Sequence, residues 1–406
     1  MSIPAALGTL RVSDSARAAV RSALANQDEV VGFDNQLRLD MSLIYPTTEL
    51  SVGYGPRLSL AHEMNAAAPW SAVFLHEGEL GFAVYGERDT LSLRQSFTFG
   101  TQSFAQIFSV PQTISAPRPG ATPSTSPSAT AAAASAATPV SPAPSGTGDL
   151  VPLQSLKVWG ESTSLAYTHR FSPRWESAVD AGFGVSGGRE GDQAFLPLLH
   201  TGDAGVALDH QLTRHHSLGG VLRGEHGWSN RGNFWLVELA GTWGIQFSRH
   251  TEAGFRAGAA YRNSRDFAAP RTSSFVPVVS GALSQTVDLR GSRALFSFFL
   301  GYDPGVDVIN ATLANRVTAL ASASWATTED ALTLAITGSQ SFGGDDVRFL
   351  GATLSWDHQL LEWLAWQLGG QVADQDAGDS PLQRASSGGL WTVFAGLSAT
   401  TETLHF

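Results

Sequence analysis

The sequence predicts an all-β fold: a closed, antiparallel transmembrane β-barrel of about 18 strands. The first observation is the alternation in residues 233–248. Trp235, Leu239 and Phe247 occupy one parity there, whereas Glu238 occupies the other. A period of two indicates a strand with one apolar and one polar face. The stretch exceeds the about 9–11 residues of a membrane-spanning strand, while an ordinary strand has about 5–6.

The second observation is that the same alternation recurs along most of the chain. The predicted strands are 37–43, 50–54, 80–84, 91–99, one starting near 156, 175–185, 204–212, 217–225, 233–248, 253–261, 279–289, 295–302, 317–325, 332–336, 350–356, 364–372 and 390–406. The third observation is that short turns alternate with longer loops, such as 187–202 and 374–387. This alternation is typical of transmembrane β-barrels.

Residues 1–33 differ from the rest and are expected to form an N-terminal segment ahead of a barrel over residues 34–406. Residues 14–26 are rich in Ala and Arg, and with Ser13 as the N-cap they predict a short helix. Residues 7–12 are the only β-like stretch in this segment. They are therefore the candidate first strand.

Residues 103–150 interrupt the barrel pattern. The core of this segment, 111–148, holds eight of the 19 prolines and one charge, Arg118, among many Ala, Ser and Thr residues. Such a composition cannot bury enough apolar surface to offset the entropy of ordering. We therefore expect a disordered Pro/Ala/Ser-rich loop.

The number of strands follows from parity. About 17 strands are recognisable, but bacterial barrels of this kind have an even number, with both termini on the short-turn side. One more crossing before residue 35 gives 18 strands, with 16 as the alternative. A soluble β-sandwich is the competing interpretation, since its outer faces would also be polar. It would need shorter strands than these.

Composition restricts the classes of function. Charged residues make up 15% of the chain, the net charge is −11 and cysteine is absent. An acidic protein does not select nucleic acid, and without cysteine no disulfide or thiolate site can form. Residues 1–10 lack the basic start and long apolar core of a secretory signal. We therefore expect a mature form that carries an added Met.

Charged residues of both signs lie at mid-strand on the polar parity. Inside a membrane-spanning strand a charge needs water or an opposite partner, so these side chains are expected to line the lumen. The predicted lumen charges are Arg38, Asp40, Glu77, Glu79, Arg94, Glu176, Asp180, Arg223, Glu225, Glu238, Glu252, Arg256 and Asp288.

Motifs that could carry chemistry are weak. Residues 182–188 contain a G-x-G-x-x-G and an overlapping G-x-S-x-G, but no helix is expected after them, as both motifs require. Asp374, Asp376 and Asp379 form a weak calcium candidate, because the bidentate Glu of a calcium loop is missing. We expect neither an enzyme nor a cofactor.

The last strand ends in an amphipathic run that closes with an aromatic residue. Thr400, Leu404 and Phe406 share one parity, which Glu402 interrupts. In this ending, and in its architecture, the chain resembles bacterial outer-membrane β-barrel proteins. The resemblance implies a barrel surrounded by outer-membrane lipid, with Phe406 and Leu404 as a signal for the barrel-assembly machinery. With 16–18 strands it also resembles porins and the barrels that export polysaccharide.

The width of such a barrel defines the function hypotheses. About 16–18 strands enclose an aqueous channel, and lumen charges of both signs suit polar or neutral cargo. The first hypothesis is an outer-membrane conduit that exports a polysaccharide, with a periplasmic polysaccharide-export protein as partner. The alternatives are a diffusion porin and a structural or adhesion barrel that presents surface loops.

Overall fold

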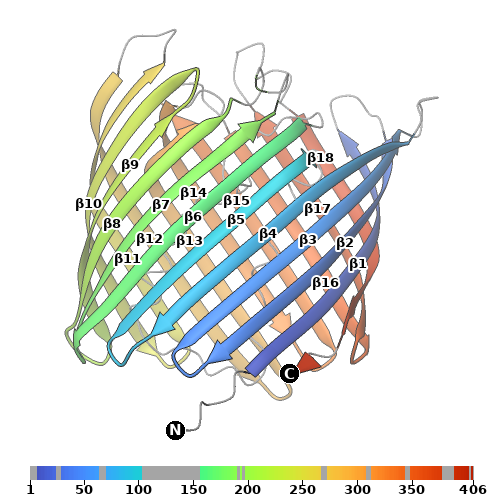
Figure 1. Cartoon of the computed structure of the whole chain (residues 1–406), viewed down its shortest axis with the longest axis horizontal. Helices are drawn as coiled ribbons and strands as arrows, with labels where there is room; N and C mark the ends of the chain where they lie inside the picture. Colours follow the sequence, from blue (N-terminus) through green and yellow to red (C-terminus); the bar gives the residue numbers. More distant parts are fainter. Residues whose placement is uncertain are drawn as a thin grey trace.

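The chain folds into a closed barrel of 18 antiparallel strands, as predicted (Figure 1). Within the described residues no helix is long and apolar enough to cross a membrane. The computed structural model describes residues 7–23, 29–63, 70–102, 156–189, 193, 197–266, 272–307, 312–342, 348–376, 388–401 and 404–405.

The strands are long, with 13 to 18 residues in each crossing from β1 to β18. In chain order they are β1 (Leu7–Ala23), β2 (Glu29–Tyr45), β3 (Thr48–Glu63), β4 (Ser71–Tyr85), β5 (Asp89–Gln102), β6 (Leu156–Ser172), β7 (Trp175–Gly188), β8 (Leu199–Gln211), β9 (His216–Trp228), β10 (Gly232–Ser248), β11 (Thr251–Asp266), β12 (Thr272–Leu289), β13 (Ser292–Asp307), β14 (Thr312–Ala326), β15 (Asp330–Phe342), β16 (Arg348–Leu361), β17 (Leu364–Asp376), β18 (Gly388–Thr400) and the short β19 (Leu404–His405).

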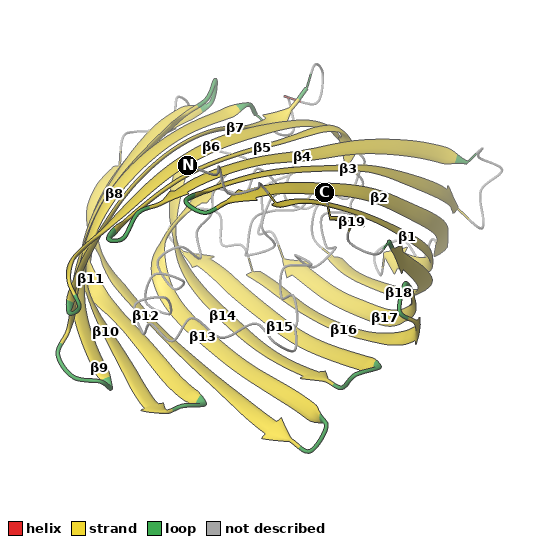
Figure 2. Cartoon of the chain, turned by 60° about the horizontal axis from the view of Figure 1, so that its bottom comes forward, coloured by secondary structure: helices red, strands yellow, loops and turns green. Residues whose placement is uncertain are grey.

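Each strand pairs with the next one in the chain, and β1 closes the ring against β18 (Figure 2). The closing register runs from Ser13↔Thr400 to Ala23↔Leu390. β19 continues the same seam, since Leu404 pairs with Leu10. A closed ring leaves no unpaired strand edge, which is the condition for a sheet to stand in lipid.

The two ends of the barrel differ in their connections. Short turns, such as those that join β2 to β3 and β4 to β5, lie at the bottom of Figure 1, together with the start of β1 and with β19. Ser or Thr side chains hold several short turns; Thr327 Oγ1, for example, accepts a hydrogen bond from the Asp330 amide at 2.8 Å. In bacterial barrels the end with short turns and termini faces the periplasm, so we call it the periplasmic end.

The outer wall is apolar between two belts of aromatic rings. Near the periplasmic end Trp175 stacks on His210 with ring centroids 4.2 Å apart. Near the opposite end His226 stacks on Trp235 at 4.0 Å and on Trp228 at 5.2 Å. Amphipathic rings of this kind favour the two membrane interfaces. The belts therefore delimit the band of the wall that faces lipid.

The predicted helix over residues 14–26 is wrong. β1 includes this segment up to Ala23 and pairs with both β2 and β18. A helix there would have left the facing edges of β2 and β18 unpaired, so ring closure overrides the helical propensity of the Ala/Arg run. The predicted first strand 7–12 is the beginning of β1, and Ser13 pairs with Arg38 rather than capping a helix. The described part of the N-terminal segment thus belongs to the barrel.

The predicted disordered loop, residues 103–150, lies outside the described residues.

Candidate functional site

The inner wall carries the charged residues named by the sequence. On each strand that contributes one, the charges and most exposed apolar side chains have opposite parity, as for Glu238 and Leu239 of β10; Ile44 at the end of β2 is an exception. The charges that were expected to line the lumen, from Arg38 to Asp288, all lie on this inner parity. Their surroundings divide them into two groups, which we call the packed network and the exposed ladder.

The packed network lies on β8 to β11. Glu238 forms an ion pair with Arg256, and their side chains are only 8% and 12% exposed. Beside this pair Arg223 Nη2 lies 3.7 Å from Asp203 Oδ2. Glu225 interacts electrostatically with Arg223 and Asp203. Charges this far out of water persist only with partners, so the network is a fixed part of the wall.

The remaining predicted charges on this side also lie close to polar groups. Asp180 of β7 lies in the field of Asp203. The other contacts, most of them nearer to the periplasmic end, are Arg170–Glu176 at 3.4 Å, Ser284–Glu252 at 2.9 Å, Arg293–Asp288 at 3.4 Å and His250–Asp288 at 3.6 Å.

The upper end of the β13–β14 hairpin packs inward against the strands beside the network. Leu313 of β14 is buried together with Phe234, Leu236 and Val278 of β10 and β12, which are not sheet neighbours of β14. Arg262 of β11 donates a hydrogen bond from Nη1 to the Leu313 carbonyl at 3.1 Å. This contact joins β14 to β10 and β11, which are not its sheet neighbours.

Two charges join that hairpin end to the packed network. Arg316 donates to the Val306 carbonyl at 3.2 Å, and Asp303 interacts electrostatically with Arg316 and Arg256. A Cβ at Gly305 would lie 2.9 Å from Cζ of Arg316. A side chain at this position would therefore push the guanidinium away from the hairpin.

The exposed ladder lies on β2, β4 and β5. Arg94 Nε approaches Glu79 Oε1 at 3.1 Å, and Arg38 Nε approaches Asp40 Oδ1 at 2.9 Å. The Arg94 and Glu79 side chains are 72% and 42% exposed. Glu77 lies on the same inner parity of β4 as Glu79. These charges face open space within the barrel.

A further set of polar residues bridges the seam between β1 and its neighbours. Arg17 Nε donates to Gln367 Oε1 at 2.9 Å, and its guanidinium lies 5.2 Å from the ring centre of Phe394. On β2 and β3, Asp34 Oδ2 lies 3.8 Å from Arg57 Nη2. Opposite charges are again matched on the inner wall.

Between the charged groups the inner wall is lined by small hydroxyl side chains. Ser96 and Ser162 share a hydrogen bond of 2.7 Å, and a second pair joins Ser297 and Ser322. Hydroxyl groups both donate and accept hydrogen bonds. They give the wall a neutral, hydrophilic character.

The calcium candidate is not assembled in the described part of the chain. Asp374 and Asp376 end β17 and pair with Leu350 and Arg348, respectively. Asp379 lies outside the described residues. Among the described ranges no three His, Asp or Glu side chains are grouped so that they could hold a metal ion.

The predicted assembly signal lies at the seam. Leu404 is exposed and belongs to β19. Above it, Thr401 donates its amide to the Val12 carbonyl at 2.9 Å and continues the closure. Phe406 lies outside the described residues.

Sequence reasoning missed further charged residues of the inner wall, among them Arg17, Asp34, Asp203, Asp303 and Arg316. Each lies on a strand that begins earlier or ends later than predicted. These residues were missed because the strands are longer than the alternating pattern. Apolar and polar residues alternate only where a strand crosses the lipid, whereas the strand itself continues beyond it. Extending each predicted strand by its own parity would have found them.

Several solved barrels are similar to this chain. OpdK, an outer membrane protein from Pseudomonas aeruginosa, is 11% identical with a TM-score of 0.44, over 98% of this chain and 99% of that one. OccAB3 from Acinetobacter baumannii is 7% identical with a TM-score of 0.41, over the same shares of the two chains. Similarity at this level does not bear on cargo. Among curated proteins no match was found.

A family profile gives the relationship. The profile of the EpsX exopolysaccharide export family matches residues 5–274, which is more than half of the 406 residues. This stretch runs from β1 into β12 and includes both the exposed ladder and the packed network. It is a family of export barrels, not of enzymes. The chain is an outer-membrane β-barrel, and it belongs to the EpsX exopolysaccharide export family.

Proposed function

We propose that the lumen of this barrel is the passage through which an exopolysaccharide chain crosses the outer membrane. The observation that carries the proposal is the open inner wall beside the exposed ladder. There Arg94 and Glu79 stand in water, next to hydroxyl side chains such as Ser96 and Ser162. A barrel of 18 strands leaves an aqueous space wide enough for a hydrated polymer.

The matched charges support a polymer of low net charge. Within the ladder each close contact joins an Arg to an Asp or Glu. A wall of this kind produces no strong single-sign field that would select one ion. It offers many weak hydrogen-bonding groups to sugar hydroxyls, so a chain can slide without being held at one deep site.

In the same proposal the chain catalyses no reaction and acts as a conduit. It receives its cargo from a periplasmic polysaccharide-export protein. The described residues at the periplasmic end form short turns, and the described part of the N-terminal segment forms β1 and the start of β2. Presentation of the polymer is therefore assigned to a separate protein.

Blocking the lumen tests the proposal in cells. Because the chain has no cysteine, Arg94→Cys provides a single attachment point for a bulky thiol reagent. Labelled cells should lose surface exopolysaccharide, measured by dye binding or sugar analysis, while unlabelled cells keep it. The control is Thr47→Cys in the β2–β3 turn, which is labelled outside the lumen.

Two results would contradict the passage. Full labelling at residue 94 with undiminished polysaccharide would exclude the lumen as the route. Loss of small-solute uptake with intact polymer export would instead assign diffusion as its function.

For assembly, we expect the barrel-assembly machinery to recognise the chain through Phe406 and Leu404. Deletion of Phe406 should lower the amount of barrel in the outer membrane, measured by immunoblot of membrane fractions. Folding of the purified chain in detergent should be unchanged. Equal outer-membrane levels with and without Phe406 would exclude this signal.

A further inference from the structure

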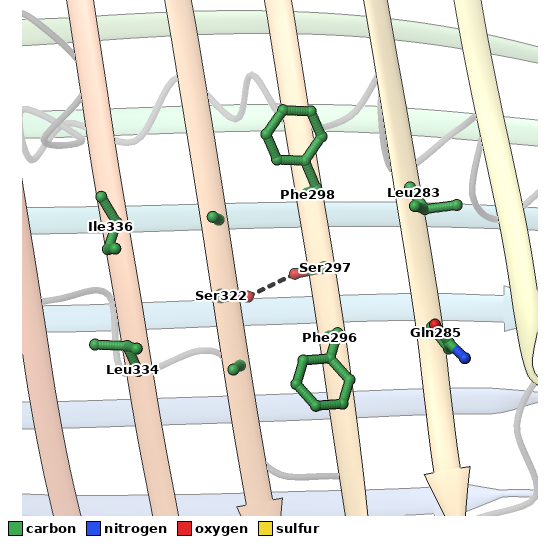
Figure 3. Close-up of a pocket in the computed structure, with 10 residues that line it drawn as sticks. Leu283, Gln285, Phe296, Ser297, Phe298, Ser322, Leu334 and Ile336 are labelled. Carbon is green, nitrogen blue, oxygen red and sulfur yellow. Dashed lines mark hydrogen bonds between the residues drawn. The ribbon is translucent and has the colours of Figure 1, made fainter.

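The outer wall carries an apolar groove along β14. Its floor is formed by Ala321 and Ala323, which are small, while larger side chains of the neighbouring strands form its sides. Figure 3 shows Phe296 and Phe298 on one side of this strand and Leu334 and Ile336 on the other; Leu283 and Gln285 extend the groove to β12.

The position of the groove identifies the chemistry of its occupant. Phe296, Phe298 and Leu283 are exposed on the outer parity, so the groove opens to the hydrocarbon of the membrane. Its floor is closed on the lumen side by the hydrogen-bonded pair Ser297–Ser322. Its volume of about 280 Å³ approaches the roughly 300–1,000 Å³ of small-molecule sites. An acyl chain fits such a space.

A cationic group lies below the groove. Arg290 occupies the β12–β13 turn, five residues beyond Gln285. A tilted strand rises about 2.3 Å per residue along the membrane normal, so the vertical separation is about 12 Å. The hydrocarbon core has a half-thickness of about 15 Å. This spacing matches that between a lipid phosphate and the middle of its own acyl chain.

Arg290 ends a row of arginines on five consecutive periplasmic turns, which we call the basic arc. All five side chains are exposed, and among the described residues none of them forms a salt bridge; the arc comprises Arg88, Arg174, Arg214, Arg249 and Arg290. Arg88 has an acidic neighbour, Asp89. The next two turns carry Glu329 and Glu362 instead.

We infer that an anionic phospholipid of the periplasmic leaflet binds this sector of the wall, with an acyl chain in the β14 groove and its phosphate on Arg290. The guanidinium group matches a phosphate with two parallel hydrogen bonds. The groove fixes the lipid laterally, and Arg290, the last arginine of the arc, supplies the cation that holds the phosphate. The next two turns, which carry Glu329 and Glu362, would repel an anionic headgroup and so limit the site on that side.

Native mass spectrometry of the purified barrel tests the site. Phosphatidylglycerol and phosphatidylcholine with identical acyl chains are titrated separately, and we expect phosphatidylglycerol to bind about tenfold more tightly, as one charge-assisted contact implies. Arg290→Gln should abolish this preference. Ala321→Phe, which fills the groove from the lipid side, should lower the binding of both lipids.

The matched control is Arg88→Gln, at the far end of the arc, which should leave binding unchanged. If Ala321→Phe does not yield a heat-resistant barrel, Ala323→Leu replaces it. Equal loss in Arg88→Gln and Arg290→Gln would show diffuse charge attraction and overturn the site. Wild-type affinity in Arg290→Gln, or in both groove variants, would overturn it as well.

Discussion

The packed network and the exposed ladder are two regions of the same inner wall, but the charged side chains are buried in the first and exposed in the second. In the network, the Glu238–Arg256 pair is buried, and Phe234 of the same strand, β10, packs against the end of the β13–β14 hairpin. In the ladder, the Glu79–Arg94 pair stands largely in water. Both pairs lie on mid-strand inner positions, and both were expected to line the lumen.

The difference teaches that parity places a residue on the inner wall, whereas packing decides its role. A buried pair is costly to break because one charge remains without a partner. An exposed pair contributes about 0–1 kcal/mol and leaves its charges free to act on passing solutes. The network therefore stabilises the wall, and the ladder is the part of the wall to which the proposed function assigns contact with cargo.

The largest effect is expected for Glu238→Lys. It places a second cation beside Arg256 and should lower the free energy of unfolding by about 3–5 kcal/mol. Denaturant titration of the barrel in liposomes, followed by tryptophan fluorescence, gives this value. An unchanged midpoint would mean that the pair is hydrated and that the two regions do not differ.

A smaller loss is expected on the lipid face of the same strand. Leu239 is 66% exposed, and Leu239→Arg should cost about 2–4 kcal/mol near the bilayer midplane. The same titration measures it. Its inner neighbour Ala240 is buried, so arginine there would also clash, and Ser96→Arg on the open wall is the appropriate control. Equal stability of Leu239→Arg and wild type would refute the assignment of Leu239 to the lipid-facing side of β10.

The smallest change in stability is expected for Glu79→Lys, within about 1 kcal/mol. Its effect should appear in transport, because a cation replaces an anion on the open wall and lumen substitutions tune selectivity. Reversal potentials across planar bilayers should shift towards anions. If the reversal potential shifted in Glu238→Lys but not in Glu79→Lys, the packed network rather than the exposed ladder would be the region that faces the open lumen.

The fold was predictable because it repeats. About 17 crossings and the inner position of residues such as Glu79 follow from a period of two, and the even number of strands in bacterial barrels supplies the eighteenth crossing. The first crossing was not predictable from local pattern, since its Ala/Arg composition favours a helix and only pairing with β2 and β18 makes it a strand.

The division of the inner wall was not predictable either. Nothing local distinguishes Glu238 from Glu79; the difference depends on Leu313, about 75 residues further along the chain, which packs inward over β10. Contacts of this kind between strands that are not sheet neighbours have no signature in alternation. The same holds for the interaction of Asp303 on β13 with Arg256 on β11, since these strands are not sheet neighbours.

The most direct test of the account is polymer entry into the purified barrel. Single barrels in a planar bilayer should conduct, and a neutral polysaccharide added on the periplasmic side should block the current transiently, with a frequency proportional to its concentration. A bulky thiol reagent on Arg94→Cys should abolish these blocks. A barrel that carries no current, or whose current the polymer leaves unchanged, would contradict a polysaccharide passage through the lumen.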